Sequence, residues 1–114
     1  MTPDHPYYQT AKRIFQYCKK KKDREGEEFP IIGTCQGFQV LALIASQDNF
    51  KIMEKIFVAG NRKVIWKGNS SKLFKGFSDT LKDKMARENL TYHYHEYSIT
   101  TGSFEKIKDQ FKVT

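Results

Sequence analysis

The sequence predicts an α/β fold with a parallel sheet centred on residues 29–34, and three observations lead to this prediction. Residues 29–34 form a short, apolar, β-branched run, which is typical of a strand buried on both faces of a parallel sheet. Residues 38–45 are apolar nearly all round, so we expect a helix covered on most sides. Gly33 and Gly37 allow a sharp turn between this strand and this helix.

Length and hydropathy limit the classes of protein to which the chain can belong. At 114 residues and 13.4 kDa, with 39% hydrophobic residues, we expect residues 1–114 to form a single domain with a modest core. A mean hydropathy of −0.67 without a long apolar run predicts no membrane span. The first residues lack the basic flank and apolar stretch of a signal peptide.

The net charge of +7 and the pI near 9.4 are typical of nucleic-acid-binding proteins. However, charges of both signs are interleaved, and the one dense basic run, Lys19 to Lys22, is followed at once by Asp23, Arg24 and Glu25. We therefore expect a solvated helix end there and no nucleic-acid partner.

The first predicted helix begins near Pro6, which suits a first turn, and a loop containing Gly26 follows it up to Glu28. Its apolar face at helical spacing is predicted to be Tyr7, Ala11, Ile14, Phe15 and Cys18. On that face Cys18 is a small buried residue. Two cysteines cannot form a disulfide scaffold.

Beyond Ser46 the pattern is looser. Residues 51–58 and 63–66 predict two strands joined by a turn at Gly60-Asn61. Residues 78–88 predict a helix capped by Ser78, with its inward face made by Leu81, Met85 and Ala86.

The last segments predict a strand, a helix and the beginning of another strand. Residues 91–97 alternate so that Tyr92, Tyr94 and Glu96 share one face of a strand while His93 and His95 share the other. Residues 103–111 predict a short capped helix, and residues 111–114 predict the start of a strand.

The chemistry is concentrated in Gly33-Thr34-Cys35-Gln36-Gly37-Phe38-Gln39. A cysteine at a strained strand-to-helix turn points outward, and the positive end of the helix favours its thiolate form. The spacing G-x-C-x-G equals that of the serine-hydrolase motif G-x-S-x-G, and the backbone N–H of Gln36 would then face an oxyanion. Two interpretations are open: Cys35 is a nucleophile, or it is a buried cysteine in an ordinary β-turn-α connection.

The segment FPIIGTCQGFQVLALIAS resembles the nucleophile segment of the γ-glutamyl hydrolases, relatives of the class I glutamine amidotransferases, and LTYHYHEYSI follows in the order of that family. The resemblance implies a flavodoxin-like, amidotransferase-like parallel sheet with a strand-Cys-helix nucleophile elbow. It also implies that Cys35 attacks a γ-glutamyl amide carbonyl and forms a thioester, as in cleavage of folylpoly-γ-glutamates, with no cofactor. Gln36 and Gln39 would contact the substrate, Gln39 at the last position of C-x-G-x-Q.

By the same resemblance His95 lies in the substrate pocket, with His93 where the family carries an asparagine. A solvent-facing or hydrogen-bonded pair of histidines on a strand is the alternative interpretation. A zinc site at His-Tyr-His would need three or four ligands, and no nearby spacing completes one. We therefore expect no metal.

Proteins of that family have further N-terminal strands, a Gly-Gly loop that provides a second oxyanion N–H, and a His-Pro-Glu segment with the principal catalytic histidine. None of these occurs in the 114 residues, so we expect an incomplete domain that is inactive alone. In one hypothesis the chain is part of a γ-glutamyl hydrolase; in another it is a non-catalytic structural or interaction subunit with a protein partner over its open sheet edges. A glutaminase subunit is a weaker third hypothesis.

Two sequence features and the family resemblance bear on the cellular location. Asn69 and Asn89 begin N-x-S/T sequons, which fit either glycosylation in the secretory path or chance. The family resemblance implies a lysosomal, vacuolar or secreted protein.

Overall fold

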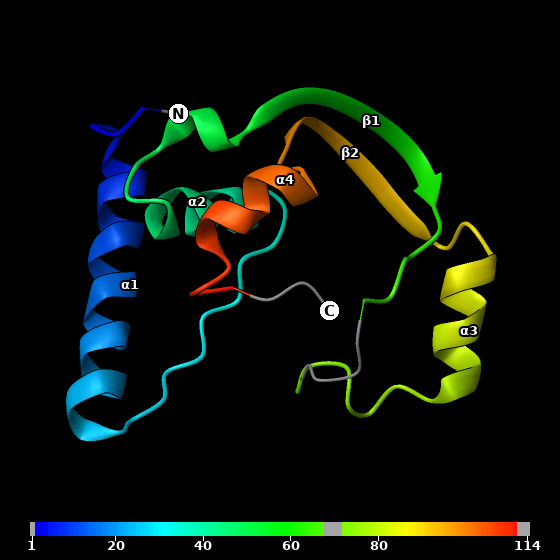
Figure 1. The fold of residues 1–114 in the computed structure, drawn as a ribbon, viewed down its shortest axis with the longest axis horizontal. Helices are drawn as coiled ribbons and strands as arrows, with labels where there is room; N and C mark the ends of the chain where they lie inside the picture. Colours follow the sequence, from blue (N-terminus) through cyan, green and yellow to red (C-terminus); the bar gives the residue numbers. More distant parts are fainter. Residues whose placement is uncertain (1, 68–71, 112–114) are drawn as a thin grey trace. The chain divides into compact units, whose positions relative to one another are not determined.

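The structure is a computed structural model that describes residues 2–67 and 72–111. Figure 1 shows the order of its elements. They are α1 (Pro6–Glu25), α2 (Gln36–Ala45), the 3₁₀ turn η1 (Phe50–Ile52), β1 (Glu54–Arg62), α3 (Asp79–Arg87), β2 (Thr91–Ser98), α4 (Thr101–Phe104) and the 3₁₀ turn η2 (Glu105–Ile107). The chain divides into two compact units, Met1–Glu54 with Ile99–Ile107 and Lys55–Ser98 with Lys108–Thr114.

In the first unit, α1 confirms the predicted first helix. Pro6 occupies the first turn, and the Nδ1 atom of His5 accepts a hydrogen bond from the backbone N–H of Tyr7 at 3.2 Å. The helix ends at Gly26, whose φ of 69° is the left-handed conformation that glycine adopts most easily. The basic run 19–22 lies in the last turns of α1, where positive charge stabilises the helix dipole.

The buried face of α1 differs from the predicted one. Tyr8 is completely buried, whereas Tyr7 and Ile14 remain 51% and 53% exposed. Cys18 is half-buried, so the interpretation of it as a buried residue holds only in part. The reason is tertiary: the ring of Tyr8 packs at 5.3 Å from that of Phe50, so Tyr8 belongs to the buried face of α1.

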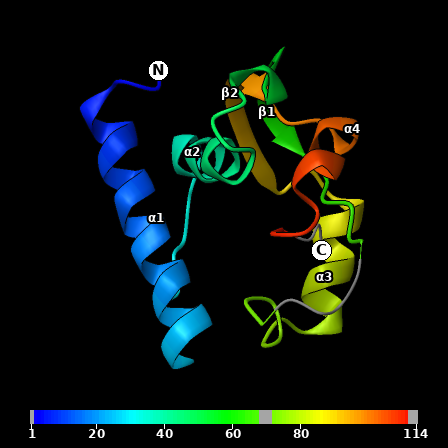
Figure 2. The ribbon, with the colours of Figure 1, turned by 60° about the vertical axis from the view of Figure 1, so that its left-hand side comes forward.

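Helix α2 is the centre of the core of the first unit, as its composition predicted. Five of its residues are buried: Val40, Ala42, Leu43, Ile44 and Ala45. Ile52 and Ile107 of the same unit are also completely buried. Figure 2 shows α1 lying beside α2.

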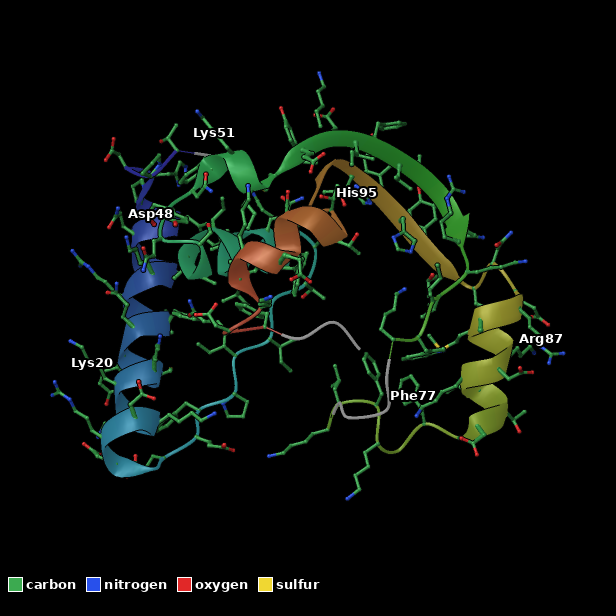
Figure 3. All side chains as sticks on the ribbon, in the orientation of Figure 1. Lys20, Asp48, Lys51, Phe77, Arg87 and His95 are labelled. Carbon is green, nitrogen blue, oxygen red and sulfur yellow. The ribbon has the colours of Figure 1, made fainter. Side chains whose placement is uncertain are left out.

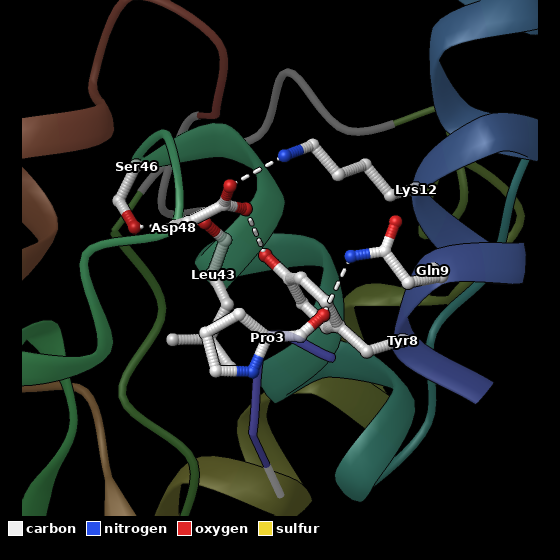
Figure 4. A network of polar contacts seen from close by, with 7 residues as sticks. All are labelled: Pro3, Tyr8, Gln9, Lys12, Leu43, Ser46 and Asp48. Carbon is white, nitrogen blue, oxygen red and sulfur yellow. Dashed lines mark hydrogen bonds and ion pairs between the residues drawn. The ribbon is translucent and has the colours of Figure 1, made fainter. Parts of the chain in front are cut away.

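A charged cluster joins α1 to the turn after α2 (Figure 4). The hydroxyl of Tyr8 donates to Oδ1 of Asp48 at 2.5 Å, and Nζ of Lys12 pairs with Oδ2 of the same carboxylate. Gln47 and Asp48 both have left-handed backbones, with φ of 58° and 64°. The hydrogen bonds from Lys12 and Tyr8 lower the pKa of Asp48, while burial, then Asp48, raises the pKa of Tyr8. We call Tyr8, Lys12 and Asp48 the Asp48 cluster.

The predicted parallel sheet is not found in the part of the chain that the structure describes. Residues 29–34 have no regular secondary structure, and the sheet is two-stranded, formed by β1 and β2 in antiparallel arrangement. A strand exists only beside a hydrogen-bonded neighbour, and no described segment pairs with residues 29–34. The α/β class is confirmed and the parallel strand order is not.

In the second unit, the predicted turn at Gly60-Asn61 was wrong. Both residues lie inside β1, where Gly60 has a φ of 111°. Residues 63–66 do not form a strand, because they contact α3 instead: the N–H of Val64 donates to the carbonyl of Met85 at 2.9 Å, and the indole of Trp66 donates to that of Lys82 at 3.1 Å.

The remaining helices follow local signals. Ser78 caps α3 as predicted and accepts from the N–H of Leu81 at 3.1 Å. The last predicted helix begins two residues early, at Thr101, because Thr100 is the cap. It ends by Ile107 rather than residue 111. Residues 112–114, predicted to be in a strand, lie outside the described residues.

We predict that Tyr8→Phe lowers the free energy of unfolding by about 1.5 kcal/mol, because it removes a hydrogen bond to a charged acceptor. Denaturant titration monitored by circular dichroism measures the change. Tyr17→Phe is the matched control, since Tyr17 is 58% exposed on the same helix and should change stability by less than about 0.5 kcal/mol.

The difference in free energy of unfolding between the wild type and Tyr8→Phe should decrease as the pH falls. The pKa of Asp48 is lowered in the folded state, so its contribution is complete above its unfolded pKa, near 4, and is lost as pH falls through the folded pKa. The gap between the wild type and Tyr8→Phe should therefore shrink at acid pH. A constant gap down to acid unfolding would contradict the role given to the Asp48 cluster.

Candidate functional site

Cys35 lies at the N-cap of α2, and it is exposed and unbonded to the other cysteine. Its backbone has a φ of 54° and a ψ of −115°, in a region that residues with side chains rarely adopt. Such a conformation costs about 1–3 kcal/mol and persists only where the surrounding structure holds it. The turn therefore presents the Cys35 side chain outward, and the alternative of a buried cysteine does not apply.

The close approach of two glycines holds this turn. A Cβ atom added to Gly33 would lie 2.7 Å from the carbonyl carbon and oxygen of Gly37 and 2.7 Å from Cδ1 of Leu41. Gly37 is different, since a Cβ there would meet nothing within 4 Å. Sequence reasoning treated both glycines alike and missed the contact with Leu41.

The first amides of α2 donate to backbone carbonyls of the turn at Cys35. The N–H of Gly37 donates to the carbonyl of Thr34 at 2.9 Å, and those of Phe38 and Gln39 donate to the carbonyl of Cys35 at 3.1 and 3.3 Å. The N–H of Gln36 donates to no acceptor among the described residues. Together with the positive end of the helix dipole, this free amide can stabilise a negatively charged oxygen beside Cys35.

His95 lies on β2 in the second unit, and Figure 3 shows it on that strand. His93 and His95 share the less exposed face, while Tyr92 and Tyr94 are 69% and 64% exposed, so the predicted alternation is confirmed. The two imidazole rings are 6.2 Å apart. Among the described residues, Nδ1 of His95 is buried without a hydrogen-bond partner, and an unsatisfied buried polar atom is unusual in a folded protein.

The structure brings three of the four predicted site residues together. Cys35, Gln36 and Gln39 lie on the first turn of α2, with Gln36 exposed and Gln39 half-buried. His95 belongs to the other compact unit.

Within residues 2–67 and 72–111, no group of three or more His, Cys, Asp or Glu side chains could hold a metal ion. No helix in those ranges is long and apolar enough to cross a bilayer.

Comparison with known proteins points to one group of enzymes. No protein-family model matches the chain. It is 33% identical over 121 residues to gamma-glutamyl hydrolase of Mus musculus, covering 96% of this chain and 36% of that protein. It is 30% identical to gamma-glutamyl hydrolase 1 of Arabidopsis thaliana, covering 89% and 30%, and 29% identical to gamma-glutamyl hydrolase of Homo sapiens, covering 93% and 35%. The chain thus spans about a third of the length of these relatives.

We predict that Gly33→Ala lowers the free energy of unfolding by about 1–3 kcal/mol, because the added methyl group collides with backbone that cannot move freely. Gly37→Ala is the matched control: open space surrounds it, and alanine is the better helix former by about 1 kcal/mol. Equal destabilisation by both substitutions would contradict the packing described for this turn.

We also predict that iodoacetamide at neutral pH labels Cys35 faster than Cys18. Cys35 is exposed at the helix N-terminus, whereas Cys18 is half-buried on α1. Time-resolved peptide mapping by mass spectrometry measures both rates in one sample. Labelling of Cys18 first, or of both at the same rate, would remove the basis for a reactive Cys35.

Proposed function

Because the chain belongs to the gamma-glutamyl hydrolase family, we propose that it carries the nucleophile segment of a γ-glutamyl hydrolase. Such an enzyme is a cysteine-type omega peptidase that cleaves γ-glutamyl bonds, as in folylpoly-γ-glutamates. The observation that carries the proposal is the strained backbone of Cys35 at the start of α2, together with its exposed side chain. Strained backbone conformations occur preferentially at active sites, so this conformation supports a functional role for Cys35.

In the proposed reaction the thiolate of Cys35 attacks the carbonyl carbon of the γ-glutamyl amide. The carbonyl oxygen becomes an oxyanion, which the free N–H of Gln36 stabilises. When the C–N bond breaks, the amine leaves with the proton that the general base had taken from the thiol, and a thioester remains on Cys35. Water then cleaves the thioester, which releases the glutamyl acid and regenerates the thiol.

Gln39 and His95 are proposed to bind the substrate. Gln39 is one helical turn after Cys35 on α2 and can reach groups bound near that thiol. The unpartnered Nδ1 of His95 has an unused capacity for one hydrogen bond, which a polar substrate group would fill.

The general base is proposed to come from outside the 114 residues. The histidines of the chain are His5, His93 and His95, and His5 is committed to capping α1. A cysteine hydrolase needs a base and a second oxyanion donor beside its nucleophile, so catalysis requires additional polypeptide.

The same additional polypeptide would complete the sheet. Phe29, Ile31 and Ile32 are 49%, 38% and 76% exposed, although the segment has the composition of a buried strand. We propose that residues 29–34 pair with strands from further sequence or from a protein partner, forming the parallel sheet of the amidotransferase-like fold around one domain. This exposure equally favours the alternative function, a non-catalytic subunit that binds through this surface.

We predict that the 114-residue chain alone shows no measurable γ-glutamyl hydrolysis. Joining it to, or folding it with, the flanking segments of a γ-glutamyl hydrolase should restore turnover of a γ-glutamyl oligomer followed by chromatography. In the joined protein Cys35→Ala should abolish turnover, by about 10³-fold or more. His95→Ala should raise KM more than it lowers kcat, because it removes a substrate contact.

Cys18→Ala in the joined protein is the control for the cysteine and should leave kcat unchanged. Two results would contradict the proposal: turnover that survives Cys35→Ala, and strong hydrolysis by the bare chain, which would place the base at His93 or His95. A correctly folded joined protein without activity would favour the non-catalytic subunit.

A further inference from the structure

One side of α1 is exposed, and Nζ of Lys21 lies over the ring of Tyr17 there, 5.9 Å from the ring centroid. Tyr7, Ile14 and Tyr17 are 51%, 53% and 58% exposed, and Thr10 between them is also exposed. These four residues, which we call the α1 seam, follow the spacing i, i+3, i+7, i+10. That spacing is the a/d repeat of a coiled coil, and it draws a nearly straight line along a helix.

The two sides of the α1 seam differ in charge. Ala11 and Cys18 border one side and are half-buried, where α1 turns toward α2. The exposed cations Arg13 and Lys20 border the other side, seven residues apart, at the g positions of the same heptads. Figure 3 shows Lys20 on the side of α1 away from α2.

These cations have no internal counter-charge. Lys21 is bonded to Glu25 at 2.8 Å and Lys22 to Glu28 at 3.7 Å, whereas Arg13 and Lys20 form no ion pair with any described residue. An apolar line with uncompensated positive charge along one edge is complementary to an apolar line bordered by negative charge.

We propose that the α1 seam docks an acidic amphipathic helix of a partner protein. The seam residues fill the a and d layers, and Glu or Asp at the flanking positions of the partner pair with Arg13 and Lys20. A single helix fits better than an anionic bilayer, because the apolar line is only two positions wide, whereas an interfacial helix buries a broad apolar face. The distance from Tyr7 to Tyr17 along α1 is about 15 Å at 1.5 Å per residue, which corresponds to about three turns of a partner helix.

The probe is a fluorescein-labelled peptide of three heptads with Leu at a and d and Glu at e and g. Its control has Lys in place of Glu. Fluorescence anisotropy with the full chain at low ionic strength should show tighter binding of the acidic peptide, weakened by added salt. Ile14→Ser should weaken binding about tenfold, the loss expected for a central apolar contact.

Matched variants separate the α1 seam from general attraction to a basic protein. Ile65→Ser, at an exposed isoleucine outside α1, should leave the affinity unchanged. Lys20→Glu should weaken binding several times more than Lys19→Glu. Both substitutions alter the net charge equally, but Lys19 lies at an f position, on the side of α1 opposite the α1 seam. Circular dichroism checks that each exposed substitution leaves the helix content unchanged.

Three outcomes would overturn the proposal. One is equal binding of the acidic and basic peptides, and another is an equal effect of Lys19→Glu and Lys20→Glu. The third is Ile14-dependent binding to phosphatidylserine vesicles that exceeds binding to the acidic peptide, which would assign the α1 seam to a membrane surface.

Discussion

The backbone of Gly33 lies so close to Gly37 and Leu41 that no side chain fits between them, and the geometry at Cys35 depends on this contact. Beside this contact Cys35 has a positive φ of 54°. Helix α2 then begins at once, so the thiol and the free N–H of Gln36 lie at the same helix end. This arrangement at the start of α2 therefore depends on close packing at Gly33, which leaves no room for a side chain.

Helix α2 can hold this strained turn because it is anchored at its other end. Its last residues are buried, and the turn that follows is tied to α1 through the Asp48 cluster. A completely buried tyrosine that shares a carboxylate with a lysine resists separation of the two helices, since separation would leave polar groups without partners. The strained turn precedes α2 and the Asp48 cluster follows it, so both depend on the position of this one helix.

Two apolar surfaces of the first unit remain exposed, and they have different chemistry. Residues 29–34 are β-branched and not paired in a sheet, so their natural complement is another strand, which supplies both apolar cover and backbone hydrogen bonds. The α1 seam is already hydrogen-bonded within its helix, so its complement must match side chains and charge. Completing the domain and binding a partner can thus proceed on separate surfaces.

The sequence by itself determined the features that depend on neighbours within one or two turns of the chain. The extent of α1 and α2, the Ser78 cap and the alternation of β2 were predictable because spacing, capping side chains and glycines act locally. The same holds for the placement of Cys35 at a sharp turn before a helix. Gly33, Cys35 and Gly37 therefore located the turn, whereas the proposed role of Cys35 as a nucleophile came from the family resemblance.

Only the tertiary structure decided which residues meet across the chain. It buried Tyr8 in place of Tyr7, because Phe50 and Asp48 lie beside Tyr8. In the structure β1 continues through Gly60. Val64 and Trp66 contact α3, because carbonyl groups of that helix accept hydrogen bonds from the Val64 amide and the Trp66 indole. Residues 29–34 remained unpaired for the converse reason: periodicity can show that a segment suits a strand, but a strand forms only where another backbone is available to bond with it.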